Sequence, residues 1–381
     1  MSEATFLEKL LDGAEVEWVA LGEVVKIKHG KNWKKLNSGN IPVYGSGGIM
    51  GHVDTYSCNK PTVLIPRKGS ITNIFYVESP LWNVDTIFYT EIDNNTLTPK
   101  YFYHFMKTVD LLSLDTGSGR PSLTQTILNK IQIPIPCPDN PEESLAIQAE
   151  IVRILDTFTE LTAELTAELT AELTARKKQY NYYRDQLLTF EDGDVEWKEL
   201  GNVTEINTGQ KPSEILESAT DFDYINAGTS RSGYSANSNC EGDIVTTPSR
   251  GQGGIGYVGY QKEPFWLGAL CYKMKSKDKD FLINKYLYYF LQSKSELLLG
   301  LKKEGGVPAV NKTDLAKLQI PVPSPSEQAR IVAILDKFDT LTHSISEGLP
   351  REIEQRQKQY EYYRDLLLSF PKPEAQMEKV A

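Results

Sequence analysis

Leucine recurs at every fourth position between residues 161 and 173. This stretch holds three head-to-tail copies of Thr-Ala-Glu-Leu, at Thr162–Leu165, Thr166–Leu169 and Thr170–Leu173. Ala, Glu and Leu are strong helix formers, and the stretch contains neither Gly nor Pro. The pattern therefore predicts one unbroken helix from about Ser144 to Phe190, roughly 65–70 Å long at ~1.5 Å per residue.

The flanks of these repeats return 180 residues later. Residues 176–185 (Arg-Lys-Lys-Gln-Tyr-Asn-Tyr-Tyr-Arg-Asp) match residues 356–365 (Arg-Gln-Lys-Gln-Tyr-Glu-Tyr-Tyr-Arg-Asp). Gly348-Leu349-Pro350 interrupts the second segment, which predicts two helices or a kink there. Because neither striped segment can bury its stripe alone, we expect the two to pair, and we expect an antiparallel arrangement.

The segments between the helices are also duplicated and read as mostly β. Val16–Val24 recurs as Val195–Val203, and Gly, Pro, Asn and Ser separate short β-rich runs. The predicted strands are 24–28, 61–65, 73–77 and 86–89 in the first copy and 223–226, 243–247, 256–260 and 268–274 in the second. Helices are predicted at 100–112 and 284–299. The Pro-rich strings 133–138 and 320–325 are predicted to be extended connectors.

These patterns predict an α+β chain with a pseudo-two-fold internal duplication. Two β-rich domains are separated by two long helical regions that form an antiparallel, coiled-coil-like spacer. The expected boundaries are 1–143 for the first β-rich domain, 144–193 for the first helical spacer, 194–325 for the second β-rich domain and 326–381 for the second helical region.

Composition is that of an ordinary globular chain, with 40% hydrophobic and 24% charged residues. The net charge of −10 argues at first against a nucleic-acid partner. The acid is densest in the first helical segment, however, so each β-rich segment can still carry a basic face. We find neither a membrane-spanning run nor an export signal, and the four cysteines are scattered. We expect a cytoplasmic protein with free thiols, no membrane contact and no zinc.

Motifs for catalysis are weak. Gly251–Gly256 fits G-x-G-x-x-G, but no helix is predicted after it to hold a pyrophosphate, so we interpret it as a chance match. There is no phosphate-binding G-x-x-x-x-G-K-[ST] loop, and the four histidines are isolated. We expect the chain to catalyse nothing by itself and to bind no cofactor or metal.

Residues 26–35 form the densest basic run and include Trp33. Lysines can contact phosphates while a planar side chain lies near a base edge; the alternative is a solvated hairpin end. Lys68 and Arg250 occupy equivalent positions, whereas Arg120 has Val307 as its counterpart. A shared frame with different loop tips would suit two different half-sites. The candidate DNA contacts are Lys28, Lys31, Lys34, Lys35, Ser46, Lys68, Arg120, Gln210, Lys211, Ser249, Arg250, Gln252 and Lys312.

The repeats and the Arg-Lys-Lys-Gln-Tyr-Asn-Tyr-Tyr-Arg-Asp string carry a family resemblance. The whole chain resembles the DNA-specificity subunit of a Type I restriction–modification system, and these motifs are similar to its IC branch. The resemblance implies two target-recognition domains that each read one half of a split site in double-stranded DNA. The helices would set the spacing, with Thr162, Leu165, Thr166, Leu169, Thr170 and Leu173 as spacer residues.

The resemblance also implies partners. Two modification subunits, which methylate adenine N6, would dock on the helices, and two restriction subunits would be recruited through them. We expect Tyr180, Tyr183, Arg184, Tyr360, Tyr363 and Arg364 at the docking surface. S-adenosylmethionine would bind the modification subunit, and ATP and Mg²⁺ the restriction subunit. Alternatives are a methyltransferase or nuclease in its own right, a stand-alone two-domain DNA-binding protein, or a coiled-coil adaptor.

Overall fold

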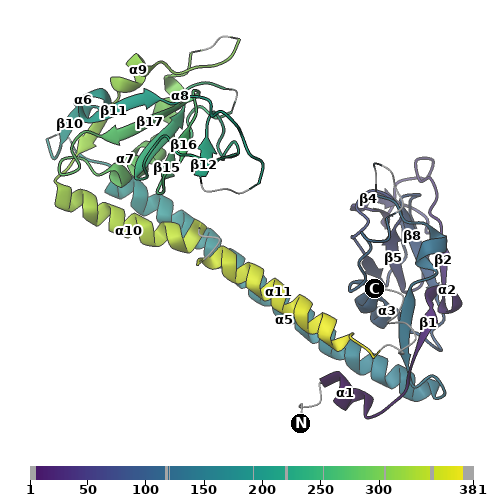
Figure 1. Ribbon diagram of the computed structural model, residues 1–381. Helices are drawn as coiled ribbons and strands as arrows, with labels where there is room; N and C mark the ends of the chain where they lie inside the picture. The colour runs from purple at the N-terminus through teal and green to yellow at the C-terminus, as the bar shows by residue number, and fades with distance from the viewer. Residues whose placement is uncertain are drawn as a thin grey trace. The chain divides into compact units, whose positions relative to one another are not determined.

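The computed structural model describes residues 6–115, 119, 121–191, 193–218, 222–251, 253–303, 306–343 and 347–371 (Figure 1). The chain divides into two compact units, and each has its own hydrophobic core. The first unit contains residues 1–167 together with 354–381, and the second contains residues 168–353. The long helix α5 (Pro141–Leu187) contributes residues to both units.

The first unit contains three β-sheets and several helices. Its four-stranded sheet has the order β2-β8-β5-β6, and its three-stranded sheet has the order β4-β3-β7 with β3 parallel to β7. A two-stranded sheet joins β1 to β9. The elements in chain order are α1 (Phe6–Leu11), β1 (Val16–Ala20), α2 (Leu21–Val24), β2 (Val25–Lys28), β3 (Ile41–Gly45), β4 (Gly48–Val53), β5 (Thr62–Pro66), β6 (Phe75–Val77), β7 (Trp82–Asn83), β8 (Ile87–Ile92), α3 (Pro99–Met106), α4 (Gln125–Leu128) and β9 (Gln132–Pro136).

The second unit has equivalent strand orders, in which each strand number is nine higher than that of its counterpart in the first unit. Its sheets are β11-β17-β14-β15, β13-β12-β16 with β12 parallel to β16, and β10-β18. The elements in chain order are β10 (Glu196–Glu199), α6 (Leu200–Val203), β11 (Thr204–Thr208), β12 (Phe222–Ile225), β13 (Tyr234–Ser235), β14 (Ile244–Pro248), β15 (Gly259–Gln261), β16 (Trp266–Leu267), β17 (Cys271–Ser276), α7 (Asn284–Ser293), α8 (Ser295–Gly300), α9 (Lys312–Ala316), β18 (Gln319–Val322) and α10 (Pro325–His343).

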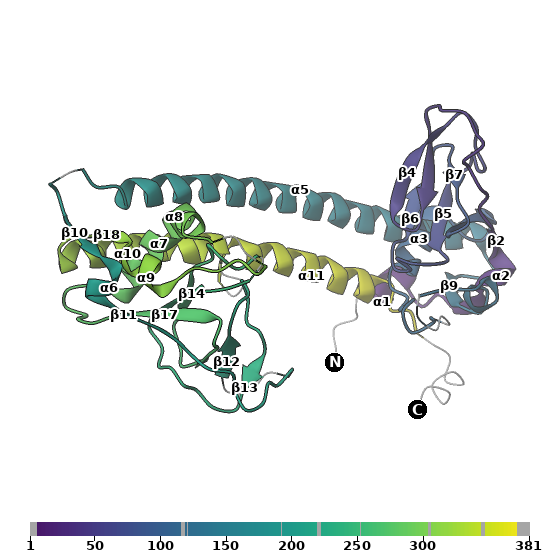
Figure 2. The same ribbon diagram turned by 90° about the horizontal axis from the view of Figure 1, so that it is seen from above.

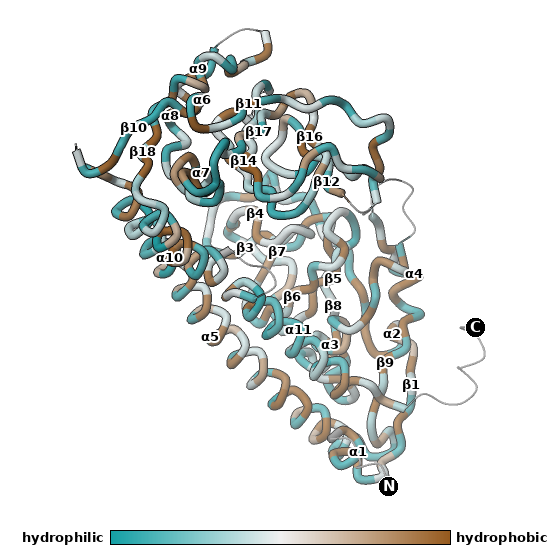
Figure 3. The backbone as a smooth tube through the Cα atoms, turned by 60° about the vertical axis from the view of Figure 1, so that its left-hand side comes forward, coloured by the Kyte–Doolittle hydropathy of each residue, from teal (hydrophilic) through white to brown (hydrophobic). Residues whose placement is uncertain are grey.

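Helix predictions hold best where the periodicity is long. The predicted unbroken helix is α5, along which hydrophobic and hydrophilic positions alternate (Figure 3). The predicted interruption is also confirmed, because α10 ends at His343 and α11 (Leu349–Leu367) begins six residues later. The helix predicted at 100–112 is shorter, ending at Met106, and the one at 284–299 divides into α7 and α8 around Lys294.

The Pro-rich strings are extended as predicted, but they are paired strands and not mere connectors. β9 pairs with β1 and β18 pairs with β10, each antiparallel. Each sheet has only these two strands, so every strand is an edge, where proline can be tolerated without its N–H. The strings also accept hydrogen bonds from buried tyrosines, Tyr101 Oη to Pro134 O at 2.8 Å and Tyr286 Oη to Pro321 O at 3.0 Å.

The end of α11 completes the core of the first unit. Leu367, Leu368 and Phe370 are all at most 5% exposed, and the Phe370 ring meets the Tyr101 ring edge-on at 6.3 Å. Trp18 Nε1 donates to the carbonyl oxygen of Pro371 at 2.8 Å. The first core therefore draws on residues more than 350 positions apart.

Candidate nucleic-acid interface

In the first unit, the loop after β2 is fastened to β7. Trp82 Nε1 donates to Lys31 O at 3.0 Å, and Lys31 N–H donates to Asn83 O at 2.9 Å. A Cβ atom at Gly30 would lie 2.0 Å from the carbonyl oxygen of Val84, so only glycine fits at this approach. The basic run 26–35 is not a hairpin end, because the strands on its two sides, β2 and β3, belong to different sheets. It begins in β2 and leaves the sheet in a loop of fixed position.

A second basic loop follows β5 and is built around Thr86. The N–H groups of Arg67 and Lys68 donate to Thr86 O at 2.8 and 3.3 Å, and Ser46 N–H donates to Thr86 Oγ1 at 3.4 Å. Gly69 N–H donates to Pro121 O at 3.1 Å. These bonds place Ser46 and Lys68 in one rim of loops.

The lysines of the run 26–35 and of the loop after β5 differ in whether they already form an ion pair. Lys28 lies in β2 and pairs with Glu91 at 3.4 Å. Lys31, Lys34, Lys35 and Lys68 are exposed, and none of them forms an ion pair within the described part of the chain. Lys28 is thus the weakest phosphate-binding candidate of the group, since its charge already has a partner.

The second unit repeats this frame with other side chains. Trp266 Nε1 donates to Gln210 O at 2.7 Å, and a Cβ atom at Gly209 would lie 1.9 Å from Leu267 O. Gly251 N–H donates to Pro308 O at 3.1 Å. The backbone of Arg250 forms an isolated antiparallel β-bridge with Ala309, as the backbone of Lys68 does with Ser122. The two cations therefore hold the same position in their units.

The remaining candidates lie at unequal depths. Gln210 and Lys211 are exposed, whereas Ser249 is only 9% exposed. Lys312 begins α9, and its Nζ donates to Asn207 Oδ1 at 3.1 Å. Arg120 and Gln252 lie outside the described residues. Val307, the sequence counterpart of Arg120, is 56% exposed.

Each unit is joined to its helix by a buried glutamine that the sequence patterns did not single out. Gln148 of α5 is fully buried; its Nε2 donates to Thr96 O at 2.8 Å, and its Oε1 accepts from Thr98 N–H at 2.9 Å. Gln328 of α10 makes the matching bonds to Phe281 O and Ile283 N–H. The two glutamines are 180 residues apart, so the duplication itself was the available signal.

Two turns further along each helix, an aspartate continues this junction. Asp156 accepts from Lys100 Nζ at 2.7 Å and lies 3.0 Å from His104 Nε2. Burial opposes ionisation of Asp156, but these hydrogen bonds outweigh it and lower its pKa. Burial lowers the pKa of His104, against the effect of Asp156. Asp336 accepts from Lys285 and Tyr289 in the same way, with tyrosine in place of histidine.

The predicted spacer residues lie on the surface of α5. Leu165, Leu169 and Leu173 are half-buried, and Thr174 Oγ1 donates to Thr170 O at 2.9 Å, a hydroxyl-to-backbone bond within the helix. Leu161 is 49% exposed. The repeats therefore carry an incomplete apolar stripe.

The predicted docking tyrosines divide into packed and exposed sets. Tyr180 is 4% exposed, and Arg184 lies over its ring while pairing with Asp185. Tyr183 stacks on Phe338 at 5.8 Å but stays 40% exposed. Tyr182, which was not among the predicted docking residues, is 59% exposed. Tyr180 and Arg184 are therefore mostly packed within the unit, whereas Tyr182 and Tyr183 are exposed.

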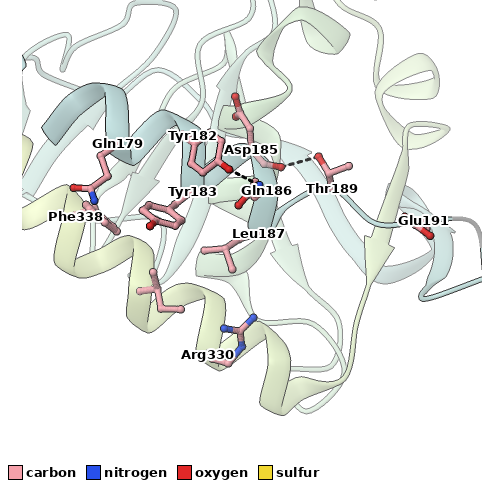
Figure 4. A pocket seen from close by; sticks show the side chains of 11 residues that line it. Gln179, Tyr182, Tyr183, Asp185, Gln186, Leu187, Thr189, Glu191, Arg330 and Phe338 are labelled. Carbon is pink, nitrogen blue, oxygen red and sulfur yellow. Dashed lines mark hydrogen bonds between the residues drawn. The ribbon is translucent and has the colours of Figure 1, made fainter. Parts of the chain in front are cut away.

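A groove of about 1140 Å³ lies beside these tyrosines, between the end of α5 and α10 (Figure 4). Gln186 Nε2 donates to Tyr182 Oη at 2.8 Å along its wall, and Arg330 lies at the α10 side. The first unit has the equivalent tyrosines. Tyr363 stacks on Phe158 at 5.8 Å, Tyr362 is 64% exposed, and Tyr360 Oη accepts from Thr159 Oγ1 at 3.1 Å while Arg364 lies over its ring.

The glycine string and the groups that could hold a metal ion were the two candidate sites for bound ligands within the described ranges. The glycine string that matches G-x-G-x-x-G leads into β15 and not into a helix. Among the described residues, no three His, Cys, Asp or Glu side chains are grouped so as to hold a metal ion. Within the same ranges, no helix combines the length and apolar character needed to cross a bilayer.

Two ranges of the chain, 14–175 and 193–355, match the model of the Type I restriction modification DNA specificity domain. The chain belongs to this family. Each range includes one set of the duplicated sheets, so there is one specificity domain in each unit.

Relatives match the specificity domains and the helices together. The chain is 40% identical over 415 residues to the Type I restriction enzyme EcoR124I/EcoR124II specificity subunit of Escherichia coli, covering 98% of this chain and 99% of that one. It is 36% identical to a putative type I restriction enzyme specificity subunit of Haemophilus influenzae, covering 96% and 98%. A solved chain of a type I restriction–modification system shares the fold, with a TM-score of 0.65, 16% identity and coverage of 93% and 97%.

Proposed function

We propose that each specificity domain reads one half of a bipartite site in double-stranded DNA, and that the chain itself catalyses nothing. The observation that carries this proposal is the repeated loop frame. Trp82 and Trp266 hold equivalent loops, and Lys68 and Arg250 occupy one position, while the neighbouring side chains differ. A constant frame with variable tips suits two readers of different sequence.

The helices would form an antiparallel spacer. Within the first unit, Phe158 lies against Tyr363 and Thr159 against Tyr360, so numbers rise on one helix as they fall on the other. Within the second unit, Tyr183 stacks on Phe338, and both Glu191 and Arg330 line the same groove. These contacts support opposed directions in each unit, and the matching halves support a pseudo-two-fold duplication. The Thr-Ala-Glu-Leu repeats would set the distance between half-sites.

The partners would be two modification subunits, docked on Tyr182 and Tyr183 in the second unit and Tyr362 and Tyr363 in the first, and two restriction subunits. Exposed aromatic pairs suit such a surface because tyrosine gives large contact area with a polar end. S-adenosylmethionine would bind the modification subunits, and ATP and Mg²⁺ the restriction subunits. The solved neighbour with the same fold is a chain of a type I system that assembles into a complex, which fits this arrangement.

Methylation sequencing of DNA exposed to the assembled complex tests the proposal. We expect modified adenines in a two-part motif with a fixed gap, and no methyl transfer by the purified chain alone. An unbroken motif would contradict the two-reader arrangement, and methyl transfer by the chain alone would contradict its non-catalytic role.

A further inference from the structure

The hairpin of β3 and β4 carries two exposed apolar side chains side by side at its tip. Ile49 is 57% exposed and Met50 is 58% exposed. They follow a tight turn at Gly47 and Gly48, and Gly48 has a φ of +109°, which favours glycine. The strand pairing shifts between Val43 and Tyr44, where Met50 is the additional residue on β4. Such a bulge redirects side chains, and here it accompanies the exposure of both at one tip.

The base of this hairpin is packed into the unit, whereas its tip is exposed. Val43 is fully buried and pairs with Trp82 of β7, and the ring of Tyr44 packs against Phe75 at 5.8 Å. A Cβ atom at Gly51 would lie 2.9 Å from the Trp33 ring. A fixed base and two uncovered apolar residues describe a presented surface, and burial in this unit does not account for them.

Basic loops flank the hairpin on two sides. Trp33 packs on Gly51, so the loop that contains Lys31, Lys34 and Lys35 lies beside β4. At the turn, Asn73 Nδ2 donates to Ser46 O at 3.1 Å, and a Cβ atom at Gly69 would lie 3.3 Å from Ser46 Oγ, which brings Lys68 alongside. In Figure 1, β4 lies at the end of the first unit away from α5.

We propose that the β3–β4 hairpin enters the major groove of the first half-site, where Ile49 and Met50 contact the C5-methyl group of a thymine. The inference rests on the proposed function and deepens it. The major groove admits a two-stranded β-ribbon, and the thymine methyl is the one apolar feature among the base edges there. The flanking lysines contact phosphates on the two sides of the groove, which orients the ribbon without reading sequence.

The second unit lacks this apolar tip among its described residues. Between β12 and β13, which lie on the side away from α10 in Figure 2, the chain has a longer loop that carries Arg231. Arg231 pairs with Asp223 at 3.1 Å and stacks over Tyr234 at 4.6 Å. Apolar readout through this hairpin therefore belongs to the first domain alone.

Thymine-to-deoxyuridine substitution tests the contact, because it removes only the methyl group. After the motif is known from methylation sequencing, the complex of full-length chain and modification subunits is titrated with duplexes that carry uracil at each thymine of the first half-site in turn. We expect one position at which wild-type affinity falls about four-fold, the value of one buried methyl group. The double variant Ile49→Ala, Met50→Ala should be insensitive to that substitution, and Ile49→Ala alone should retain part of it.

Leu297→Ala, which truncates a comparably exposed side chain on α8 at 48% exposure, is the matched control and should behave as wild type. The proposal is overturned if uracil at no position lowers the affinity of the wild-type complex, or if the Ile49→Ala, Met50→Ala variant loses as much affinity as the wild type. As long as the wild-type complex still binds its site specifically, these outcomes leave the proposed function intact. Loss of modification-subunit co-elution in the hairpin variant would also overturn it, since the hairpin would then be a protein contact. Absence of sequence-specific binding by the wild-type complex would instead refute the proposed function.

Discussion

Replacing Gln148 with alanine should strongly destabilise the first unit. The change removes bonds to Thr96 O and Thr98 N–H, and a further contact of 3.3 Å between Gln148 Nε2 and Ser144 Oγ. Leaving two backbone groups without their partners costs about 1–3 kcal/mol each, reduced where water can reach them. We therefore expect a loss of about 2–4 kcal/mol, which corresponds to roughly 4–16 °C in the melting temperature of a unit of this size.

The assay is thermal unfolding of the full chain, followed by the fluorescence of Trp18 and the other tryptophans. Gln355→Ala is the matched control, because this exposed glutamine on α11 should change stability by less than about 0.5 kcal/mol. Gln328→Ala should destabilise the second unit by a similar amount to Gln148→Ala in the first, through the equivalent bonds to Phe281 and Ile283. A Gln148→Ala effect no larger than that of Gln355→Ala would refute the view that these bonds hold the domain to its helix.

Three further outcomes follow from the site and the helices. Deleting Thr166–Leu169 removes ~6 Å of helix and ~40° of net rotation, against ~3.4 Å and ~34–36° for one base pair, so methylation sequencing should show the gap shortened by one base pair and both half-sites unchanged. Lys31→Ala with Lys68→Ala should reduce the slope of log affinity against log salt by about 1.8, whereas Lys9→Ala should leave it unaltered. Because its pKa is lowered on folding, Asp156 stabilises the protein above the pKa of an ordinary aspartate, about 3.9, and loses this effect as pH falls through the lowered value. When the free energy of unfolding is measured against pH, it should therefore fall less steeply in acid for Asp156→Asn than for the wild type. If the two pH profiles are the same, this carboxylate does not contribute to the acid dependence of stability.

The sequence predicts the long helices well because their signal repeats over many turns. The Thr-Ala-Glu-Leu run and the match at an offset of 180 residues lead directly to α5, α10 and α11. The three-stranded sheet of the first unit was missed. β3 and β7 pair in parallel across some 40 residues of chain, and the run around Gly45 and Gly48 has too many glycines for a clear alternation. Tertiary contacts, and not local preference, create these strands.

The predicted docking tyrosines show a related limit. Tyr180, Tyr182 and Tyr183 occupy several faces of one helix, and their spacing does not say which face meets the protein's own core. The structure places Tyr180 beside Phe338 and Gln292 and leaves Tyr182 in the open. The rim lysines were more accessible to prediction because charge next to glycine marks a loop, although the glycine contacts that fix those loops, such as Gly30 against Val84, depend on the folded backbone.

The packing of Leu367, Leu368 and Phe370 into the first core has a consequence for the order in which the protein is made. Residue 167 leaves the ribosome about 200 residues before these side chains do. At about 5–20 residues per second, the first unit waits roughly 10–40 s for the piece that covers Tyr101 and binds Trp18 through Pro371. The second unit has all of its chain by residue 353 and can finish first. The later-made unit therefore has all of its residues before the earlier-made unit does.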